Sequence, residues 1–245
     1  MCLSSGKYDD KLSFLMFHSV LGPPDDSVPR GVSMDTGKFR RLCHFLADSG
    51  NGGECYHNFI PTFDDGYVDN FDIAAPVLKE FGLPGIFFIS TAMIGRHFNT
   101  PAGNRMEVMS RAMIRELSMA GFAIGSHGHE HSYLIRMASI ELSEQLKKSR
   151  DILENIIGKQ VTELSYPFGK WDERVVAAAR TAGFSRAFAV HGGSCMDPRM
   201  VIPRIPVSGE RETYMEKAAV SLKRRPIVME TLNFLRTLLT PPCNL

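Results

Sequence analysis

Short runs of β-branched and aromatic residues alternate with amphipathic stretches along most of this chain, and this alternation restricts its fold more than any other feature. Five of the amphipathic stretches end at a glycine, the residue that most readily adopts the left-handed conformation that stops a helix. A unit of helix, glycine and strand therefore recurs. The glycines are Gly50, Gly82, Gly121, Gly158 and Gly183. The runs expected to be strands are 12–17, 59–63, 85–90, 122–125, 161–165, 185–190 and 201–207.

Regular alternation of strands and helices is typical of a parallel sheet, and about seven units suit a closed or nearly closed barrel better than an open sheet. We therefore predict an α/β fold, an irregular (β/α) barrel of about seven strands. A chain of 245 residues with 44% hydrophobic residues can form one sizeable core. We expect a single domain over residues 1–245, in which 208–245 form a C-terminal helical extension outside the barrel. The turn-rich stretch from Gly95 to Met106 predicts a loop over one barrel face, with a short helix as the alternative.

The charge balance and the cysteines exclude several classes of protein. With 28 basic and 27 acidic residues, the formal net charge is +1, so we expect no nucleic-acid partner. The first eleven residues are polar and lack the apolar segment of a signal peptide or a membrane span, which predicts a cytoplasmic protein without a transmembrane segment. The five cysteines are scattered and form no C-x-x-C pair, which argues against a disulfide framework and against a cysteine zinc site.

Polar residues follow most of the predicted strands. In parallel α/β folds the loops after the strands converge on one face, where functional groups gather. We therefore expect these side chains to share one end of the barrel. They are His18, Asp64, Asp65, His127, Tyr166 and His191.

Two adjacent carboxylates, Asp64 and Asp65, come directly after the apolar run 59–63 and precede Gly66. Adjacent carboxylates raise one another's pKa unless a cation separates their roles. One carboxylate bound to a metal ion and the other acting as a general base would resolve this conflict. A surface Asp-Asp-Gly turn is the alternative interpretation of these residues taken alone.

Three histidines lie two residues apart between His127 and His131. On a helix or a helical turn, His127 and His131 share a face, and this spacing lets two imidazoles bind one metal ion. Together with a carboxylate they form a set that leaves positions open for water and substrate. His129 would join them in an extended segment, and we assign it no ligand role. A histidine-rich surface loop is the alternative.

Three motifs resemble those of the NodB-homology polysaccharide deacetylases, carbohydrate esterase family four. Residues 62–67, Thr-Phe-Asp-Asp-Gly-Tyr, resemble the first motif of this family. Residues 126–131 resemble the second motif of the family, and residues 165–169, Ser-Tyr-Pro-Phe-Gly, are similar to the third motif. The likeness covers about residues 12–207, and the first two motifs in this order are specific.

The resemblance implies a metal-dependent hydrolase that removes an N-acetyl group from an amino sugar of a surface-polysaccharide or glycolipid precursor. Carried over by position, Asp64 is the general base, and the backbone N–H of Phe168 helps to hold the oxyanion. The divalent metal ion, Zn²⁺ first and Co²⁺ or Ni²⁺ as alternatives, is bound by Asp65, His127 and His131. Two other interpretations stay open: a hydrolase of a small non-sugar amide, of deformylase or ring-opening type, and a catalytically impaired carbohydrate-binding homologue.

The chain departs from the family pattern at two catalytic positions. Ser165 stands where the family has an arginine that pairs with the base, and we expect Arg204, near another strand end, to replace it. No histidine follows His191, although the family's general acid is a histidine late in the chain. Met16-Phe17-His18 resembles the Met-Tyr-His-like setting of a circularly permuted branch that acts on poly-N-acetylglucosamine, which makes His18 the expected acid.

A third departure concerns the aspartate and tryptophan that flank the acid in the family, for which Asp197 and Trp171 are weak candidates. Trp171 is the only tryptophan of the chain, and it falls in the loop after the fifth predicted strand. An exposed aromatic ring there could stack on a sugar, whereas core packing is the alternative. The expected oxyanion and substrate groups are thus Phe168, Tyr166, Trp171 and Arg204.

Overall fold

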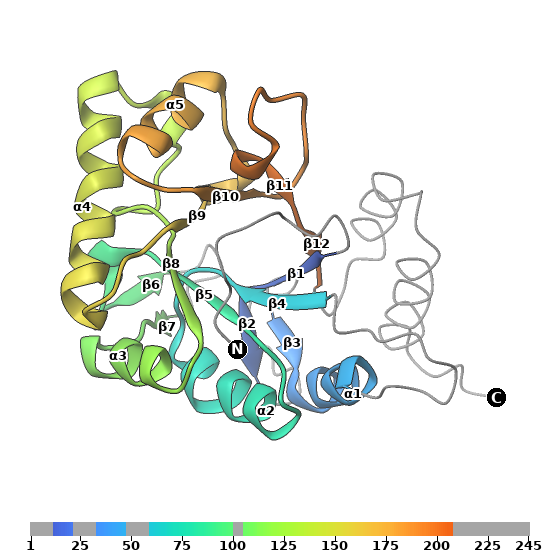
Figure 1. The fold of residues 1–245 in the computed structure, drawn as a ribbon. Helices are drawn as coiled ribbons and strands as arrows, with labels where there is room; N and C mark the ends of the chain where they lie inside the picture. Colours follow the sequence, from blue (N-terminus) through green and yellow to red (C-terminus); the bar gives the residue numbers. More distant parts are fainter. Residues whose placement is uncertain (1–11, 22–32, 48–58, 100–104, 208–245) are drawn as a thin grey trace.

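The computed structural model describes residues 12–21, 33–47, 59–99 and 105–207. Eight parallel strands form one sheet, which curls into a nearly closed barrel (Figure 1). Across the sheet the strands follow the order β11-β10-β9-β8-β5-β4-β1-β12. Their bounds are β1 (Ser13–Phe17), β4 (Phe59–Phe63), β5 (Ile86–Ile89), β8 (Ala123–Ser126), β9 (Glu163–Ser165), β10 (Arg186–Ala189), β11 (Ile202–Pro203) and β12 (Ile205–Pro206). The predicted irregular (β/α) barrel is confirmed.

The last two strands are halves of one expected strand, residues 201–207. β11 pairs with β10, whereas β12 pairs with β1 at the other edge of the sheet. Arg204 lies at the break between the halves, and its N–H donates to the Ala189 carbonyl. This segment therefore brings the first and the last strands of the chain together, and the prediction of about seven strands becomes eight because one of them is divided.

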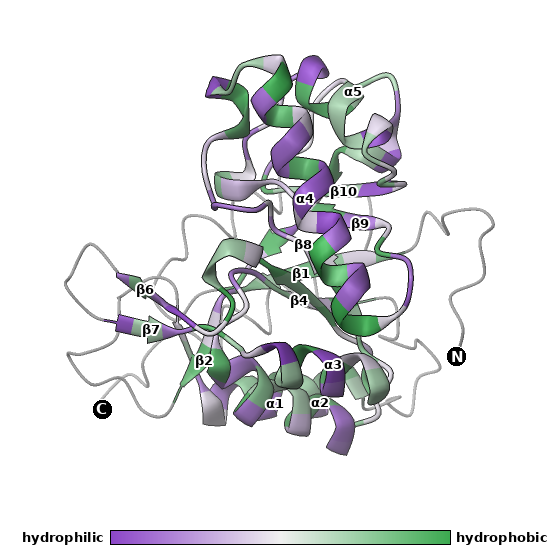
Figure 2. Cartoon of the chain, turned by 90° about the vertical axis from the view of Figure 1, so that its left-hand side faces the viewer, coloured by the Kyte–Doolittle hydropathy of each residue, from purple (hydrophilic) through white to green (hydrophobic). Residues whose placement is uncertain are grey.

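Helices lie around the outside of the strands (Figure 1). In Figure 2 the strands β1, β4 and β8 are mostly hydrophobic, whereas the helices alternate hydrophobic and hydrophilic residues, as amphipathic helices do. The glycines expected to end helices have positive φ angles at four positions, whereas Gly50 lies outside the described residues. The helices are α1 (Thr36–Ala47), α2 (Ala75–Glu80), α3 (Arg111–Met119), α4 (Ser139–Ile157) and α5 (Glu173–Thr181).

Two pairs of short strands were not predicted from the sequence. β2 (Ser19–Leu21) pairs in parallel with β3 (Ser33–Asp35), and β6 (His97–Asn99) pairs in antiparallel with β7 (Arg105–Glu107). The second pair falls in the stretch from Gly95 to Met106, so the expected loop, and its short-helix alternative, are wrong there. Strands of three residues are too short to show an alternating pattern, which is why turn signals dominated the prediction.

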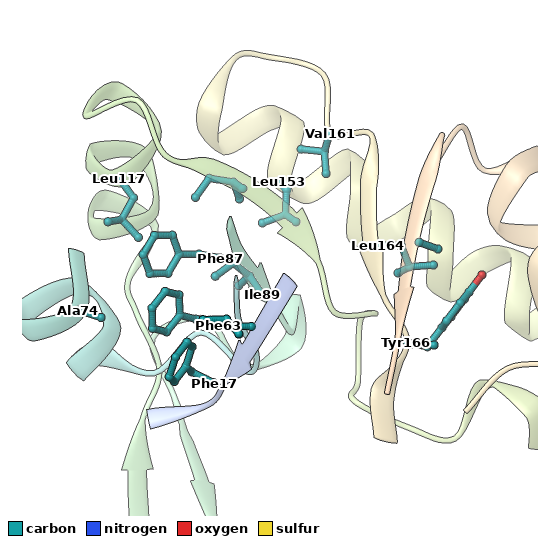
Figure 3. Packing of buried hydrophobic residues seen from close by; sticks show 14 of the residues in the cluster. Phe17, Phe63, Ala74, Phe87, Ile89, Leu117, Leu153, Val161, Leu164 and Tyr166 are labelled. Carbon is teal, nitrogen blue, oxygen red and sulfur yellow. The ribbon is translucent and has the colours of Figure 1, made fainter. Parts of the chain in front are cut away.

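Aromatic rings from neighbouring strands stack in the layer between the sheet and the helices. Phe63 lies between Phe17 and Phe87, with ring centroids 5.4 and 4.9 Å apart (Figure 3). Successive residues of a strand point to opposite faces. Because Phe17 and Phe63 pack outward, the residue that follows each strand, His18 or Asp64, starts from the opposite, inner side at the mouth of the barrel.

Among the described residues, no helix is both long and apolar enough to cross a membrane. The cytoplasmic location and the helical extension at 208–245 stay predictions, because residues 1–11 and 208–245 lie outside the described part of the chain.

Candidate metal and catalytic site

The three residues expected to bind a metal ion lie together at the barrel mouth. Potential ligand atoms of Asp65, His127 and His131 all lie within 4.8 Å of one another. The Asp65 Oδ1 atom is 3.5 Å from His127 Nε2 and 3.2 Å from His131 Nε2. Asp65 Oδ1 is buried and has no hydrogen-bond partner within the described part of the chain. A buried carboxylate oxygen without a partner is costly, and a cation at this point would satisfy it, so these residues fit a divalent metal ion.

The histidines meet through an irregular loop, not through the helix or helical turn expected from their spacing. Residues 127–131 form no helix, and both Gly128 and His131 have positive φ angles, of 76° and 52°. Thr91 and Ala92 donate from their N–H groups to the carbonyls of Gly128 and His129, which ties the loop to the end of β5. The left-handed residues therefore turn the chain back on itself and bring His131 to His127.

His129 points to a different partner, in agreement with its exclusion from the ligands. Its Nδ1 lies 2.8 Å from the Thr91 hydroxyl. The His129 side chain is buried and contributes to fixing the loop, and it is not part of the candidate set of Asp65, His127 and His131.

Hydrogen bonding and burial fix the two histidines that are candidate metal ligands. His127 Nδ1 lies 2.9 Å from the Ser165 carbonyl, so Nδ1–H donates to that oxygen, and this bond orients Nε2 toward Asp65. Burial, followed by the nearby His127, lowers the pKa of His131 to about 4. The lowered pKa favours the neutral His131 imidazole, which is the form that binds metal ions.

Tyr67 supports Asp65, the carboxylate among the three candidate ligands. Its hydroxyl hydrogen-bonds to the Asp65 carboxylate, and burial followed by that carboxylate raises the pKa of Tyr67 far above its usual range. The hydroxyl therefore stays protonated and remains a donor to Asp65, an outer-shell contact that orients a metal ligand.

Asp64 is held by Arg204, as predicted. Arg204 Nη1 and Nη2 donate to Asp64 Oδ1 and Oδ2, both at 2.7 Å, and both side chains are buried. Burial by itself would raise the pKa of Asp64, but the Arg204 guanidinium and then His127 outweigh it and hold this pKa well below its usual value. The carboxylate is therefore ionised at neutral pH.

Ser165, in the place of the family's arginine, belongs to the same network. Its hydroxyl accepts from Arg204 Nη2 at 2.8 Å and donates to Asp64 Oδ2 at 3.3 Å. Thr62 accepts from Arg204 Nη1 at 3.2 Å. The sequence analysis did not predict these two hydroxyls. The small residue at position 165 was a signal for them, because a serine leaves room for a guanidinium from another strand.

His18 reaches the site from the first strand. The register pairs Phe17 with Phe63, so His18 and Asp64 lie at neighbouring strand ends, and the Asp64 N–H donates to the Phe17 carbonyl at 2.9 Å. The electrostatic effect of His18 lowers the pKa of both Asp64 and His131. This effect is smaller than that of burial and of the nearer charged groups. The structure therefore brings His18 beside the metal set, while its role as an acid stays a prediction.

Phe168 lies at the rim of the site in a strained backbone conformation. Its φ is 59°, a left-handed value that costs a non-glycine residue about 1 kcal/mol or more. Its ring is 44% exposed, lies 4.6 Å from the His131 ring and stacks on Tyr133 at 4.0 Å. Arg136 covers the Tyr133 ring at 4.6 Å. An exposed aromatic surface that the sequence analysis did not identify thus borders the metal ligands.

Tyr166 does not face the site, so the expectation that it contacts substrate is wrong. Its side chain is fully buried in the core between the strands and the helices (Figure 3), and its hydroxyl donates to the Met200 carbonyl at 2.9 Å. Tyr166 directly follows β9, and its large ring is stabilised by apolar packing, whereas a strand end alone suggested exposure.

Trp171 and Asp197 have structural contacts of their own. Trp171 is partly buried against the main core, and its ring lies against Gly193, where an added Cβ would come within 2.6 Å of Trp171 Cζ2. Asp197 pairs with Arg199 at 3.0 Å and accepts from the Arg199 N–H. These contacts agree with the packing alternative for Trp171; stacking on a sugar stays a prediction.

Comparison with known proteins identifies the family of this chain. A profile of the family described as "Polysaccharide deacetylase" matches residues 58–187, just over half of the chain. YxkH of Bacillus subtilis (strain 168), named after the same family, is 25% identical over 204 residues, which are 75% of this chain and 66% of YxkH. This chain thus spans slightly less than two thirds of YxkH. A poly-beta-1,6-N-acetyl-D-glucosamine N-deacetylase of Staphylococcus aureus (strain MSSA476) is 22% identical over 212 residues, 82% of this chain and 71% of that relative.

Solved structures share the fold. IcaB from Ammonifex degensii has a TM-score of 0.68 at 21% identity and covers 85% of this chain and 95% of its own. BC0361, a polysaccharide deacetylase from Bacillus cereus, has a TM-score of 0.67 at 22% identity, with coverage of 86% and 68%. With a family profile that matches over half of its length, the chain belongs to the polysaccharide deacetylase family.

Proposed function

We propose that this protein is a metal-dependent N-deacetylase that hydrolyses the N-acetyl group of an amino sugar. The observation that carries the proposal is the convergence of Asp65, His127 and His131 around a buried carboxylate oxygen that has no hydrogen-bond partner among the described residues, beside the ionised Asp64. Two imidazoles and one carboxylate leave positions open for water and substrate, which is the arrangement that hydrolytic metal sites need.

The bound ion would supply Lewis acidity toward a water molecule and toward the amide carbonyl. Asp64, ionised and fixed by Arg204, takes a proton from the attacking water. The Phe168 N–H donates to the oxygen on which negative charge develops, a contribution of about 3 kcal/mol for one such donor. His18 gives a proton to the nitrogen as the C–N bond breaks, and the products are acetate and the free amine.

Zn²⁺ is our first candidate for the ion, because imidazole nitrogens and a carboxylate are ligands that it accepts, with Co²⁺ and Ni²⁺ as alternatives for the same donors.

The sugar substrate is supported by the rim of the site and by the relatives. Phe168 and Tyr133 are 44% and 36% exposed beside His131, and the exposed part of this stacked pair offers an apolar surface against which a pyranose ring can pack. A relative named for poly-beta-1,6-N-acetyl-D-glucosamine aligns with 82% of this chain. We therefore propose N-acetylglucosamine units of a surface polysaccharide or its precursor as the substrate.

A catalytically impaired homologue is the alternative, for which there are two reasons: the arginine missing from position 165 and the fourth motif without clear counterparts. Arg204 supplies a guanidinium to Asp64 from another strand, which removes the first of these reasons.

Release of acetate tests the proposal directly. Purified protein loaded with Zn²⁺ or Co²⁺ is incubated with β-1,6-linked N-acetylglucosamine oligomers, with N-acetylated nucleotide sugars and with formylated or cyclic amides. We expect acetate from the amino sugars only, and loss of this activity in Asp64→Asn with an unchanged metal content. Binding of no divalent ion, or full activity of Asp64→Asn, would overturn the mechanism.

A further inference from the structure

Asp69 and Asn70 are buried polar residues that the proposed chemistry does not use. Asn70 is fully buried and Asp69 is 8% exposed. They lie just after the Asp-Asp-Gly-Tyr motif, where Asn70–Ala74 forms a π-helical turn. Such turns are rare and occur frequently at functional sites. Burying a carboxylate and an amide is costly unless their hydrogen bonds matter to the fold or to the function.

Their hydrogen bonds converge on the residues around His18. Asn70 Nδ2 donates to the His18 carbonyl at 2.8 Å and to Asp69 Oδ1 at 2.7 Å. Asp69 accepts from the Ser19 hydroxyl at 2.8 Å and from the Val20 N–H at 2.9 Å. His18 is thus fixed at its own carbonyl and through both residues that follow it.

The segment before His18 is held as well. The Asp64 N–H donates to the Phe17 carbonyl at 2.9 Å, so the bond that fixes one side of His18 comes from the proposed base itself. Residues 64–70 therefore hold each residue from Phe17 to Val20. His18 is held against the same short segment that carries Asp64 and Asp65.

The Asn70 side chain contributes through its donor end. Asn70 Oδ1 is buried and has no hydrogen-bond partner among the residues that the structure describes. Exchanging its oxygen and nitrogen would place an oxygen against the His18 carbonyl, which is repulsive, so the N–H groups must face His18 and Asp69. An amide with an unsatisfied oxygen in the core is explained by the two hydrogen bonds that its nitrogen makes.

We propose that Asn70, backed by Asp69, is a positioning residue for His18 and acts by fixing the backbone from which the imidazole reaches the leaving nitrogen. The inference rests on the proposed role of His18 as the acid. Proton transfer requires hydrogen-bond distance between the acid and the nitrogen, so a looser backbone lowers the rate without removing the group.

The leaving group separates positioning from structural support. An amine must be protonated as the C–N bond breaks, whereas 4-nitrophenolate leaves 4-nitrophenyl acetate without a proton. We compare Asn70→Ala, His18→Ala and the double variant, measuring kcat and KM on a β-1,6-linked N-acetylglucosamine oligomer and on 4-nitrophenyl acetate. Zn²⁺ content and thermal unfolding are recorded for each variant.

The proposal expects three results. Asn70→Ala lowers kcat on the oligomer at least about 10-fold, while KM stays within about 3-fold of the wild-type value. The loss in kcat is a part of the contribution of a general acid, which is roughly 10²-fold or larger. Hydrolysis of the aryl ester stays within about 3-fold of the wild type. The double variant is no slower on the oligomer than His18→Ala, because both changes act through one group.

Two further variants complete the test. Leu153→Ala removes a fully buried side chain of α4, and its destabilisation should leave the ratio of amide to ester hydrolysis unchanged. Ser19→Ala deletes a single hydrogen bond to Asp69 and should lower the same ratio more mildly, which keeps the test open should Asn70→Ala fold poorly.

The outcomes separate this inference from the proposed function. Equal losses on amide and ester in Asn70→Ala, or a double variant clearly slower than His18→Ala, would overturn the positioning role alone. An unchanged oligomer rate in His18→Ala would overturn both the acid assignment and the inference that rests on it.

Discussion

Replacing Arg204 with methionine is the change most revealing of how this site is built. The side chain is fully buried, and its guanidinium donates to both oxygens of Asp64 and to the hydroxyls of Thr62 and Ser165. Methionine is unbranched and shorter than arginine, but it replaces most of the apolar stem and fills irregular space without providing a donor. Arg204→Met therefore removes the charge and the donors of the guanidinium while keeping much of the packing along the stem.

The expected cost follows from the burial of both partners. Removing one member of a buried ion pair typically destabilises a protein by about 3–5 kcal/mol, because the remaining charge has no compensation. Two hydroxyls also lose a partner, at about 1 kcal/mol each. Asp64 can relieve part of this cost by taking up a proton, since burial alone raises its pKa. We therefore expect Arg204→Met to lower the free energy of unfolding by about 3–4 kcal/mol at pH 7.

A double-mutant cycle separates the pair from the packing. The free energies of unfolding of wild type, Arg204→Met, Asp64→Asn and the double variant are measured in urea without added metal, using the fluorescence of the single tryptophan, Trp171. The double variant should be more stable than Arg204→Met, since it no longer buries an unpaired carboxylate. A loss below about 1 kcal/mol in Arg204→Met, or strictly additive effects, would refute the reasoning.

Three further predictions concern other groups. Asp65→Asn should abolish binding of Zn²⁺ in isothermal titration, and the metal-dependent increase of about 2.7 kcal/mol in unfolding free energy, expected at 100 times the Kd, should disappear with it. Burial raises the pKa of Asp69 from 3.8 to about 6, so the folded state holds this proton more tightly than the unfolded state. The stabilisation by the protonated Asp69 is therefore present below about pH 4 and is lost as the pH rises to about 6, which lowers the free energy of unfolding by about 3 kcal/mol. Urea unfolding of Asp69→Asn at several pH values should lack this pH dependence. Tyr133→Ala should raise KM for sugar oligomers several-fold and leave hydrolysis of 4-nitrophenyl acetate nearly unchanged, which steady-state kinetics on both substrates would check.

The barrel was predictable because its signal is local and repeated. Each predicted strand is bounded by turn residues, and Gly82, Gly121, Gly158 and Gly183 have the positive φ angles that end a helix. The β6 and β7 pair escaped prediction, because three residues per strand carry too little pattern to outweigh the turn signals around them. The repeated local pattern therefore predicts the barrel, but it does not predict the short strand pairs that are added to it.

The site was predictable only in part, because its contacts are long-range. The Asp64 to Arg204 pair spans 140 positions of the chain, and no spacing rule connects residues so far apart; the family likeness supplied the need for an arginine. His127 and His131 do meet, but through left-handed residues in a loop, so the helical argument reached a correct pairing for a wrong reason. Tyr166 shows the opposite error, since its place after a strand suggested exposure while its ring is in the core.

Barrel closure explains how the arginine and the histidine can come from unusual places in the chain. β1 lies between β4 and β12, so residues that follow the first strand and residues that interrupt the last are both neighbours of Asp64 at the end of β4. The Val207 N–H donates to the Met16 carbonyl, which fixes these two ends of the sequence against each other. In such a barrel, Arg204 at the break between β11 and β12 can supply the guanidinium that is missing from position 165 at the end of β9. The carboxylate of Asp64 keeps its place. The chemistry depends on which strand ends are adjacent, and the circular order of the strands keeps that adjacency when the order along the chain changes.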